Sequence, residues 1–318
     1  MACRRRRQPA ARAPGDDLSR DSGLTLVEVM IAMLIALVVI AGSLAFVARG
    51  RAAHRTGESL AQLEESLDAA FALLVDEIRL AGYLGLAPPA GAVAGATAIG
   101  TAERPDLAVS GACGSSLAHD LHVALAVADA AYEAAPGVPV RCGASPDGRR
   151  VEQSDTLIVR RAAAVPTRPQ AGRLQLETNL RAAVLAANGA GILGADARWH
   201  ALEVGVFYIS ADSTGRGGWP SLRRKRLVGG TRPAFQDEEL VSGIADMQIE
   251  IGVDDPVDAD TAVDRWLRPA EIRPDNAMRA LKLELEAISD ITEPAQPGMH
   301  RRKRVARVIE LRNHGARP

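Results

Sequence analysis

Residues 22–32 read Ser-Gly-Leu-Thr-Leu-Val-Glu-Val-Met-Ile-Ala and open an apolar run that continues to residue 48. Between residues 24 and 48 only one side chain is charged, that of Glu28. As an α-helix rising about 1.5 Å per residue, the run is long enough to cross the roughly 30 Å hydrocarbon core of a membrane. The positive-inside rule then predicts a cytoplasmic amino terminus and a periplasmic remainder, because six arginines precede the run: Arg4, Arg5, Arg6, Arg7, Arg12 and Arg20.

Three interpretations of this run are open. A secretory signal peptide would end in a small-x-small site, which Ser43-Leu44-Ala45 would supply, but its apolar core is normally about 7–15 residues long and uncharged. A plain membrane anchor accounts for the length but not for Glu28, since a carboxylate in lipid costs free energy and signals function. The third interpretation explains the position of Glu28 as well.

Gly23, Leu24 and Glu28 resemble the type IV prepilin signature, although Leu24 stands where the family more often has Phe. The resemblance implies that prepilin peptidase cuts between Gly23 and Leu24 and that the new amino terminus at Leu24 is methylated. It also implies that Glu28 is the charge used in filament assembly. Residues 1–23 would then be a cleaved leader, and residues 24–50 a transmembrane helix that later forms the filament core.

The chemistry of the cut end explains why such a motif would direct assembly. Cleavage after Gly23 leaves an ammonium at Leu24 and a carboxylate at Glu28, one helical turn away. Both charges become buried when helices pack into a filament, and an unpaired buried charge costs several kcal/mol, on the order of 3–5. A staggered neighbour would present its ammonium to Glu28. The staggered arrangement is therefore favoured over arrangements that leave charges unpaired.

The helical pattern continues beyond the apolar run. Residues 51–85 are expected to extend the helix to residue 80, with Gly42, Gly50 and Gly57 as points of bending or local melting. Gly82, Pro88 and Pro89 predict its end. An apolar stripe recurs at spacings of three and four and predicts that this half packs on a head domain: Leu60, Leu63, Leu67, Phe71, Leu74 and Ile78.

Residues 86–318 are predicted to form a periplasmic, β-rich head. The clearest strand is residues 281–286, Leu-Lys-Leu-Glu-Leu-Glu, whose alternation buries one face and exposes the other. The predicted fold is α+β and type IV pilin-like, with the long amino-terminal helix packed on a mainly antiparallel sheet. The expected strands are residues 155–161, 172–178, 202–210, 221–228, 241–253, 280–288 and 304–312.

Three downstream segments resemble the PilW family of minor pilins. They are residues 80–83 (Leu-Ala-Gly-Tyr), 154–161 (Ser-Asp-Thr-Leu-Ile-Val-Arg-Arg) and 240–254, which contains Asp-Met-Gln at 246–248. The resemblance implies a structural protein and not an enzyme, one that primes pilus assembly and sits at the filament tip. The implied partners are other minor pilins, the major pilin, prepilin peptidase and the inner-membrane assembly platform. The implied location is the inner membrane and then the extracellular pilus.

Two other functions are open alternatives. A type II secretion pseudopilin would share the cleavage motif and the helix. A tip-located pilin that binds DNA or a surface ligand would use the basic runs at residues 223–226 and 301–304. These runs contain no aromatic residues for base stacking, and the formal net charge of the 318 residues is −1, so nucleic acid is not an expected partner. The runs are instead expected to protect exposed strand edges.

Cysteine content agrees with an exported head. Cys3 lies in the leader, which leaves Cys113 and Cys142 in the exported part. Two cysteines in an oxidising periplasm are expected to form a disulfide, and free thiols are the alternative. The bridge would stabilise the chain by roughly 3–4 kcal/mol in the loop-entropy account.

Two groups of residues are candidates for a metal site and for a catalytic site. An acidic segment of Asp254, Asp255, Asp258 and Asp260, followed by Asp264, supplies oxygen ligands for calcium, but its spacing is not that of an EF-hand. No cofactor is therefore expected. A second group consists of two serines, a histidine and an aspartate that lie close together in sequence: Ser115, Ser116, His119 and Asp120. A catalytic serine is normally placed on a strand-turn-helix elbow, and the sequence around these serines does not predict one. Catalysis is therefore not expected there.

Overall fold

The computed structural model describes residues 25–87, 93–97, 104–111, 113–129, 133–135, 138–139, 151, 153–254, 262–273, 276–292 and 298–313. The chain divides into two compact units, Met1–His54 and Arg55–Pro318. The first contains the apolar part of a helix. The second contains the remainder of that helix and every strand found among the described residues.

A single helix, α1 (Leu26–Leu80), accounts for 55 residues. It runs unbroken through Gly42, Gly50 and Gly57, so the local melting expected at these glycines does not occur. The helix ends at Leu80, as the sequence predicts. Gly82 then adopts a positive φ of 77°, which a glycine accepts without steric cost, and donates its N–H to the carbonyl of Arg160 at 3.0 Å.

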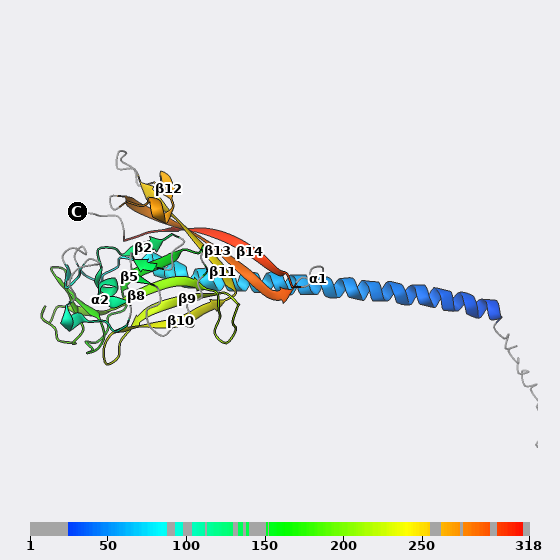
Figure 1. The fold of residues 1–318 in the computed structure, drawn as a ribbon, viewed down its shortest axis with the longest axis horizontal. Coiled ribbons are helices and arrows are strands. Elements are labelled where there is room, and N and C mark those ends of the chain that lie inside the picture. The colour runs from blue at the N-terminus through cyan, green and yellow to red at the C-terminus, as the bar shows by residue number, and fades with distance from the viewer. Residues whose placement is uncertain are drawn as a thin grey trace, which may run out of the picture. The chain divides into compact units, whose positions relative to one another are not determined.

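The second unit holds two main sheets, visible in Figure 1. The larger has eight strands, all antiparallel to their neighbours except the β1–β7 pair. Its order begins at β1 (Val93–Ala94) and continues through β7 (Ala183–Ala186), β6 (Gln175–Thr178), β8 (Arg198–Ser210), β5 (Thr156–Ala162) and β2 (Leu125–Ala128). The hairpin of β9 (Ser221–Val228) and β10 (Ala234–Ser242) joins this sheet where β9 pairs with β8.

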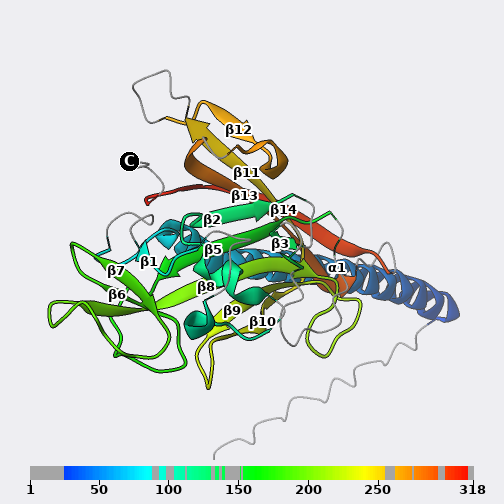
Figure 2. The ribbon, with the colours of Figure 1, turned by 60° about the vertical axis from the view of Figure 1, so that its left-hand side comes forward.

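The smaller main sheet is fully antiparallel, in the order β12 (Arg265–Leu267), β11 (Ile244–Asp254), β13 (Ala277–Thr292) and β14 (His300–Glu310). Figure 2 shows β11, β13 and β14 crossing beside the larger sheet. The remaining elements are short: η2 (Pro105–Leu107), α2 (Gly114–His119), β3 (Glu133–Ala135) paired with β4 (Val138–Pro139), and η3 (Pro269–Glu271).

The predicted α+β fold is confirmed, although several strand bounds differ from the expected ones and one expected strand is two. Leu281, Leu283 and Leu285 of β13 are fully buried, as the alternation at residues 281–286 predicts. Residues 241–253, however, are not one strand. The chain turns at Gly243, whose φ of 83° favours glycine, so β10 ends before it and β11 begins after it.

The carboxyl-terminal half of α1 forms the centre of the main core. Its predicted apolar stripe is buried at Leu63, Leu67, Phe71, Leu74 and Ile78, whereas Leu60 stays 40% exposed. These side chains pack with residues of both sheets. A second core lies on the opposite face of the larger sheet, because neighbours along β5 and β8 alternate between the two faces.

Candidate functional site

The amino-terminal end of α1 is capped by a side chain close to Glu28. Thr25 immediately precedes the helix, and its Oγ1 accepts a hydrogen bond from the backbone N–H of Glu28 at 3.3 Å. A threonine at this position followed three residues later by glutamate has the spacing of a capping box. The carboxylate also lies in the first turn, where the helix dipole favours negative charge. Gly23 and Leu24 lie outside the described residues, so cleavage and methylation there stay predictions.

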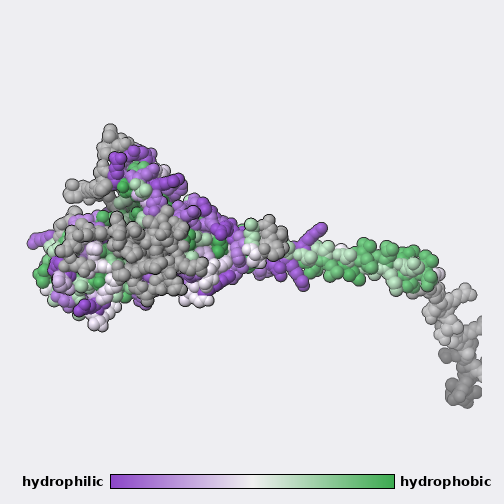
Figure 3. Space-filling view, viewed as in Figure 1, coloured by the Kyte–Doolittle hydropathy of each residue, from purple (hydrophilic) through white to green (hydrophobic). Residues whose placement is uncertain are grey.

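The helix that follows presents apolar side chains on all sides. The large apolar residues from Leu26 to Val47 are between 36% and 80% exposed. Figure 3 shows this apolar segment in green. Within the described part of the chain, α1 is the one helix long and apolar enough to cross a membrane, judged by length and composition. A helix that is apolar on every side is suited to lipid or to the interior of a helix bundle.

The second half of α1 is joined to the larger sheet through Glu77. Its two carboxylate oxygens accept hydrogen bonds from Arg161 of β5 at 2.7 Å and from Arg224 of β9 at 3.0 Å. All three side chains are at most 20% exposed, so water screens these ion pairs less than it screens surface pairs. Glu77 therefore links the helix to two strands that are distant in sequence.

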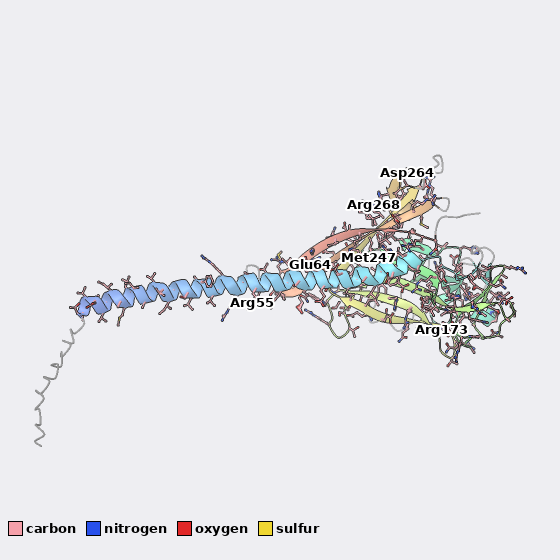
Figure 4. All side chains as sticks on the ribbon, turned by 180° about the vertical axis from the view of Figure 1, so that it is seen from behind. Arg55, Glu64, Arg173, Met247, Asp264 and Arg268 are labelled. Carbon is pink, nitrogen blue, oxygen red and sulfur yellow. The ribbon has the colours of Figure 1, made fainter. Side chains whose placement is uncertain are left out.

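A second group of contacts joins α1 to the smaller sheet along β14. Lys303 pairs with Glu64 at 2.7 Å, and Arg307 pairs with Asp68 at 2.5 Å. The guanidinium of Arg307 also lies 4.4 Å from the ring centre of Phe71. Figure 4 labels Glu64 on the helix beside this sheet. Because these pairs are more exposed, each is expected to contribute at most about 1 kcal/mol.

Two segments that resemble the PilW family meet in space through residues that are 93 and 94 positions apart in sequence. The hydroxyl of Ser154 accepts the N–H of Met247 at 2.9 Å, and the carboxylate of Asp155 accepts the N–H of Ile249 at 2.8 Å. In return, the N–H of Asp155 donates to the carbonyl of Met247 at 2.8 Å. These side chains thus satisfy the free backbone edge of β11 and join the two sheets.

A polar cleft of about 450 Å³ lies beside this junction. It is lined by the outward side chains of β11, β13 and β14 and by residues near the ends of β2, β5 and β12. Several of its charges neutralise one another, as in the 2.8 Å pair between Lys282 and Glu250. Figure 4 labels Arg268, which lines one side of the cleft. The remaining lining residues include Asp129, Asp246, Glu284 and Arg304.

The calcium hypothesis receives no support from the described residues. Asp254 is buried, and its Oδ2 accepts two hydrogen bonds from Arg279, at 2.9 and 2.5 Å. Asp255, Asp258 and Asp260 lie outside the described residues. Among the residues that are described, no group of three His, Cys, Asp or Glu side chains could hold a metal ion.

The basic run at residues 223–226 is an internal ion-pair ladder. In the β9–β10 register, Arg223, Arg224 and Lys225 lie opposite Glu239, Glu238 and Asp237, respectively. Arg223 and Lys225 are 5% and 0% exposed. The expected edge-protecting role is wrong for this run, because β9 has neighbouring strands on both sides. The sequence did contain a signal, since a basic run, Gly229-Gly230 and an acidic run in that order predict a hairpin with opposite charges.

The second basic run, residues 301–304, lies on β14, which ends the order of the smaller sheet. This placement agrees with the expected protection of an exposed edge. The cations also pair across the sheet, for example Arg302 with Glu286 at 2.6 Å and Arg304 with Glu286 at 2.8 Å. Burial acts to raise the pKa of Glu286, but hydrogen bonds from the two arginines outweigh it and hold that pKa below the usual value.

The remaining sequence candidates that the structure describes lie in and near α2. Cys113 is buried and disulfide-bonded, but Cys142 lies outside the described residues, so their pairing stays a prediction. Ser115 and His119 are both 1% exposed. Ser115 Oγ accepts the N–H of Val109 at 2.9 Å, and His119 Nε2 lies 2.9 Å from the carbonyl of Leu107. These contacts fix α2 against η2 and the neighbouring loop.

Comparison with known families agrees with this structure. Residues 206–290, from within β8 to within β13, match the family model of the type IV pilus-assembly protein W, PilW. Residues 18–44 match the model of the prokaryotic N-terminal methylation motif. No curated protein and no solved structure matches the chain. The two family models confirm the resemblance inferred from the sequence: the chain is PilW-like and has a prepilin-type N-terminal methylation motif.

Proposed function

We propose that this PilW-like, type IV pilin-like chain is a minor pilin that enters the inner membrane through α1 and is then built into a pilus. Prepilin peptidase would cut between Gly23 and Leu24 and methylate Leu24. The head would face the periplasm until assembly and would become extracellular in the filament. The match of residues 18–44 to the N-terminal methylation motif supports this processing.

One observation carries the proposal: α1 is a continuous helix with two different kinds of surface. Its first part is apolar and exposed, whereas its second part is held in the head by a buried stripe and by Glu77. A force applied to the exposed part would therefore be transmitted to the head through the core. This is the mechanical property required of a subunit that is extracted from a membrane into a fibre.

Glu28 supplies the assembly step. In the membrane it lies at the edge of the apolar run, and Thr25 caps its backbone N–H. When helices pack together, burial of its carboxylate becomes costly unless a neighbouring ammonium pairs with it. The new amino terminus of an adjacent subunit is the cation expected to do so. The partners are accordingly other minor pilins and the major pilin, delivered by the inner-membrane assembly platform.

The size of the head favours a particular position of the subunit in the filament. Two sheets packed on one helix make a bulky head that would crowd its neighbours if it were repeated along a slender fibre. A single copy at the tip, where minor pilins would prime assembly, avoids this crowding. Labelling the head along sheared pili tests this point, and an even distribution along the fibre would contradict it.

Intact mass of the membrane-extracted protein is the primary test. Loss of residues 1–23 with gain of one methyl group, dependent on the peptidase and abolished by Gly23→Val, is the expected result. A chain that remains uncut, or that ends after Ala45, would overturn the proposal. Gly42→Val in α1 is a matched control, because it leaves the cleavage site intact and should not change the mass of the processed end.

A further inference from the structure

Two arginines follow the apolar run directly and differ from many arginines of the head. Arg49 and Arg51 are exposed, and among the described residues neither forms an ion pair. In the head, by contrast, many arginines pair with carboxylates, including Arg161, Arg223, Arg224, Arg279, Arg302, Arg304 and Arg307. The two unpaired cations therefore lack the kind of partner that the protein provides elsewhere.

Their helical phase limits what that partner can be. Both belong to α1, and residues two positions apart on an α-helix are rotated by about 200°. Arg49 and Arg51 thus leave the helix on nearly opposite sides. One neighbouring helix would reach one of them but not both. A layer of negative charge that surrounds the helix would reach both.

The position of the two arginines along the helix axis identifies such a layer. At about 1.5 Å per residue, the stretch from Leu26 to Ala48 covers about 34 Å, close to the roughly 30 Å hydrocarbon core of a bilayer. Arg49 and Arg51 then emerge in the headgroup region, which is about 5–8 Å thick in each leaflet. Their long side chains can extend along the interface, and each guanidinium can donate two parallel hydrogen bonds to phosphate oxygens.

We propose that Arg49 and Arg51 form a phosphate-binding collar that binds the headgroups of anionic phospholipids in the periplasmic leaflet of the inner membrane. The collar holds α1 at a fixed depth before assembly, and extraction into a filament requires its release. This inference rests on the proposed insertion of α1 into the membrane. The bound group is a phospholipid phosphate, and an acidic partner helix is the competing occupant.

The test uses the full processed chain in detergent, titrated with phosphatidylglycerol or phosphatidylcholine and measured by native mass spectrometry. The wild-type chain is expected to bind phosphatidylglycerol on the order of tenfold more tightly. Arg49→Gln/Arg51→Gln is expected to lose this preference, and Arg49→Lys/Arg51→Lys to keep most of it. Arg79→Gln/Arg181→Gln removes two exposed arginines that also have no ion pair among the described residues, and it should change nothing.

Two results would overturn the collar. One is a wild-type chain with no preference between the lipids, and the other is a glutamine variant that retains the preference. If that variant instead keeps its lipid binding but loses cross-linking to other pilins, the occupant is an acidic partner helix. Carbonate extraction and intact mass separate this failure from failure of the proposed function. A chain that stays membrane-embedded and processed leaves the pilin assignment intact while the collar is rejected.

Discussion

The carboxylate of Asp155 accepts the backbone N–H of Ile249 at 2.8 Å, and both residues are buried. Asp155 directly precedes β5 of the larger sheet, whereas Ile249 lies in the middle of β11 of the smaller one. A side chain therefore supplies the hydrogen bond that a neighbouring strand would otherwise make. The two sheets are joined at this point without a continuous ladder, and α1 packs on both.

Replacing Asp155 by alanine is expected to lower the free energy of unfolding by about 1–3 kcal/mol, because a buried backbone N–H loses its acceptor. Asp155→Asn keeps an amide oxygen at the same place and should cost less. Urea unfolding of the detergent-solubilised chain measures both. Equal effects of the two variants would show that the acceptor oxygen is not what stabilises the junction.

Glu77→Ala should destabilise the chain by about 2–4 kcal/mol, since it leaves Arg161 and Arg224 partly buried without their shared carboxylate. Hydrogen exchange in the last two turns of α1 should accelerate in parallel. Glu65→Ala is the matched control, because Glu65 is exposed and makes no ion pair within the described part of the chain. Unchanged exchange in Glu77→Ala would mean that the apolar stripe alone fixes the helix.

Lys225→Met is expected to leave the chain equally stable or more stable at pH 7. Burial lowers the pKa of Lys225, and the nearby carboxylate of Asp237 offsets this only in part. The folded state therefore binds this proton less tightly than the unfolded state. The resulting penalty is fully present below the folded pKa and is relieved as pH rises toward the ordinary value of 10.5.

The wild-type chain should accordingly gain stability relative to Lys225→Met as pH rises toward about 10.5, in urea titrations at a series of alkaline pH values. Arg223→Met is the contrasting variant. Arg223 bonds to Asp237 at 3.0 Å and to Glu239 at 2.9 Å, so its removal should cost about 3–5 kcal/mol. A large loss of stability in Lys225→Met would contradict the inference that burial dominates.

Acid should destabilise the β9–β10 hairpin through Glu239. Burial acts to raise the pKa of Glu239, but hydrogen bonds from Ser213 and Thr214 and the charge of Arg223 outweigh it, so that the pKa lies below the ordinary 4.5. The stability that this carboxylate contributes is present above pH 4.5 and is lost as pH falls through the lower folded value. Glu239→Gln should therefore flatten the fall in urea stability between pH 5 and pH 3. If the substitution left the dependence of stability on pH unchanged, Glu239 would not be a cause of the acid destabilisation.

Glu28→Gln is expected to be cleaved and retained in the membrane at wild-type levels but to be depleted on the order of tenfold from sheared filaments. The amide keeps the helix start but cannot pair with an ammonium. Intact mass reports processing, and immunoblots of sheared and membrane fractions report incorporation. Glu65→Gln, elsewhere on the same helix, should enter filaments normally. Normal incorporation of Glu28→Gln would contradict the charge-pairing mechanism.

Local sequence patterns determined the parts of this protein whose structure depends on near neighbours. The apolar run, the end of α1 at Leu80, the buried stripe and the alternation at residues 281–286 are periodicities within a single element. A helix or strand with such a periodicity can bury its apolar side chains in few ways. The prepilin-like motif around Glu28 is equally local, which is why the class of protein could be predicted before its fold.

Only the tertiary structure decided which distant groups became partners. The sequence predicts that the run at residues 223–226 protects an exposed strand edge, but β10 places Asp237, Glu238 and Glu239 opposite it. The bonds from Ser154 and Asp155 to β11 likewise join residues more than 90 positions apart. Charge and hydrogen-bonding capacity are visible in a sequence. Whether they are buried, and against what, depends on the packing of whole sheets, because desolvation and pairing arise only when the complete core has formed.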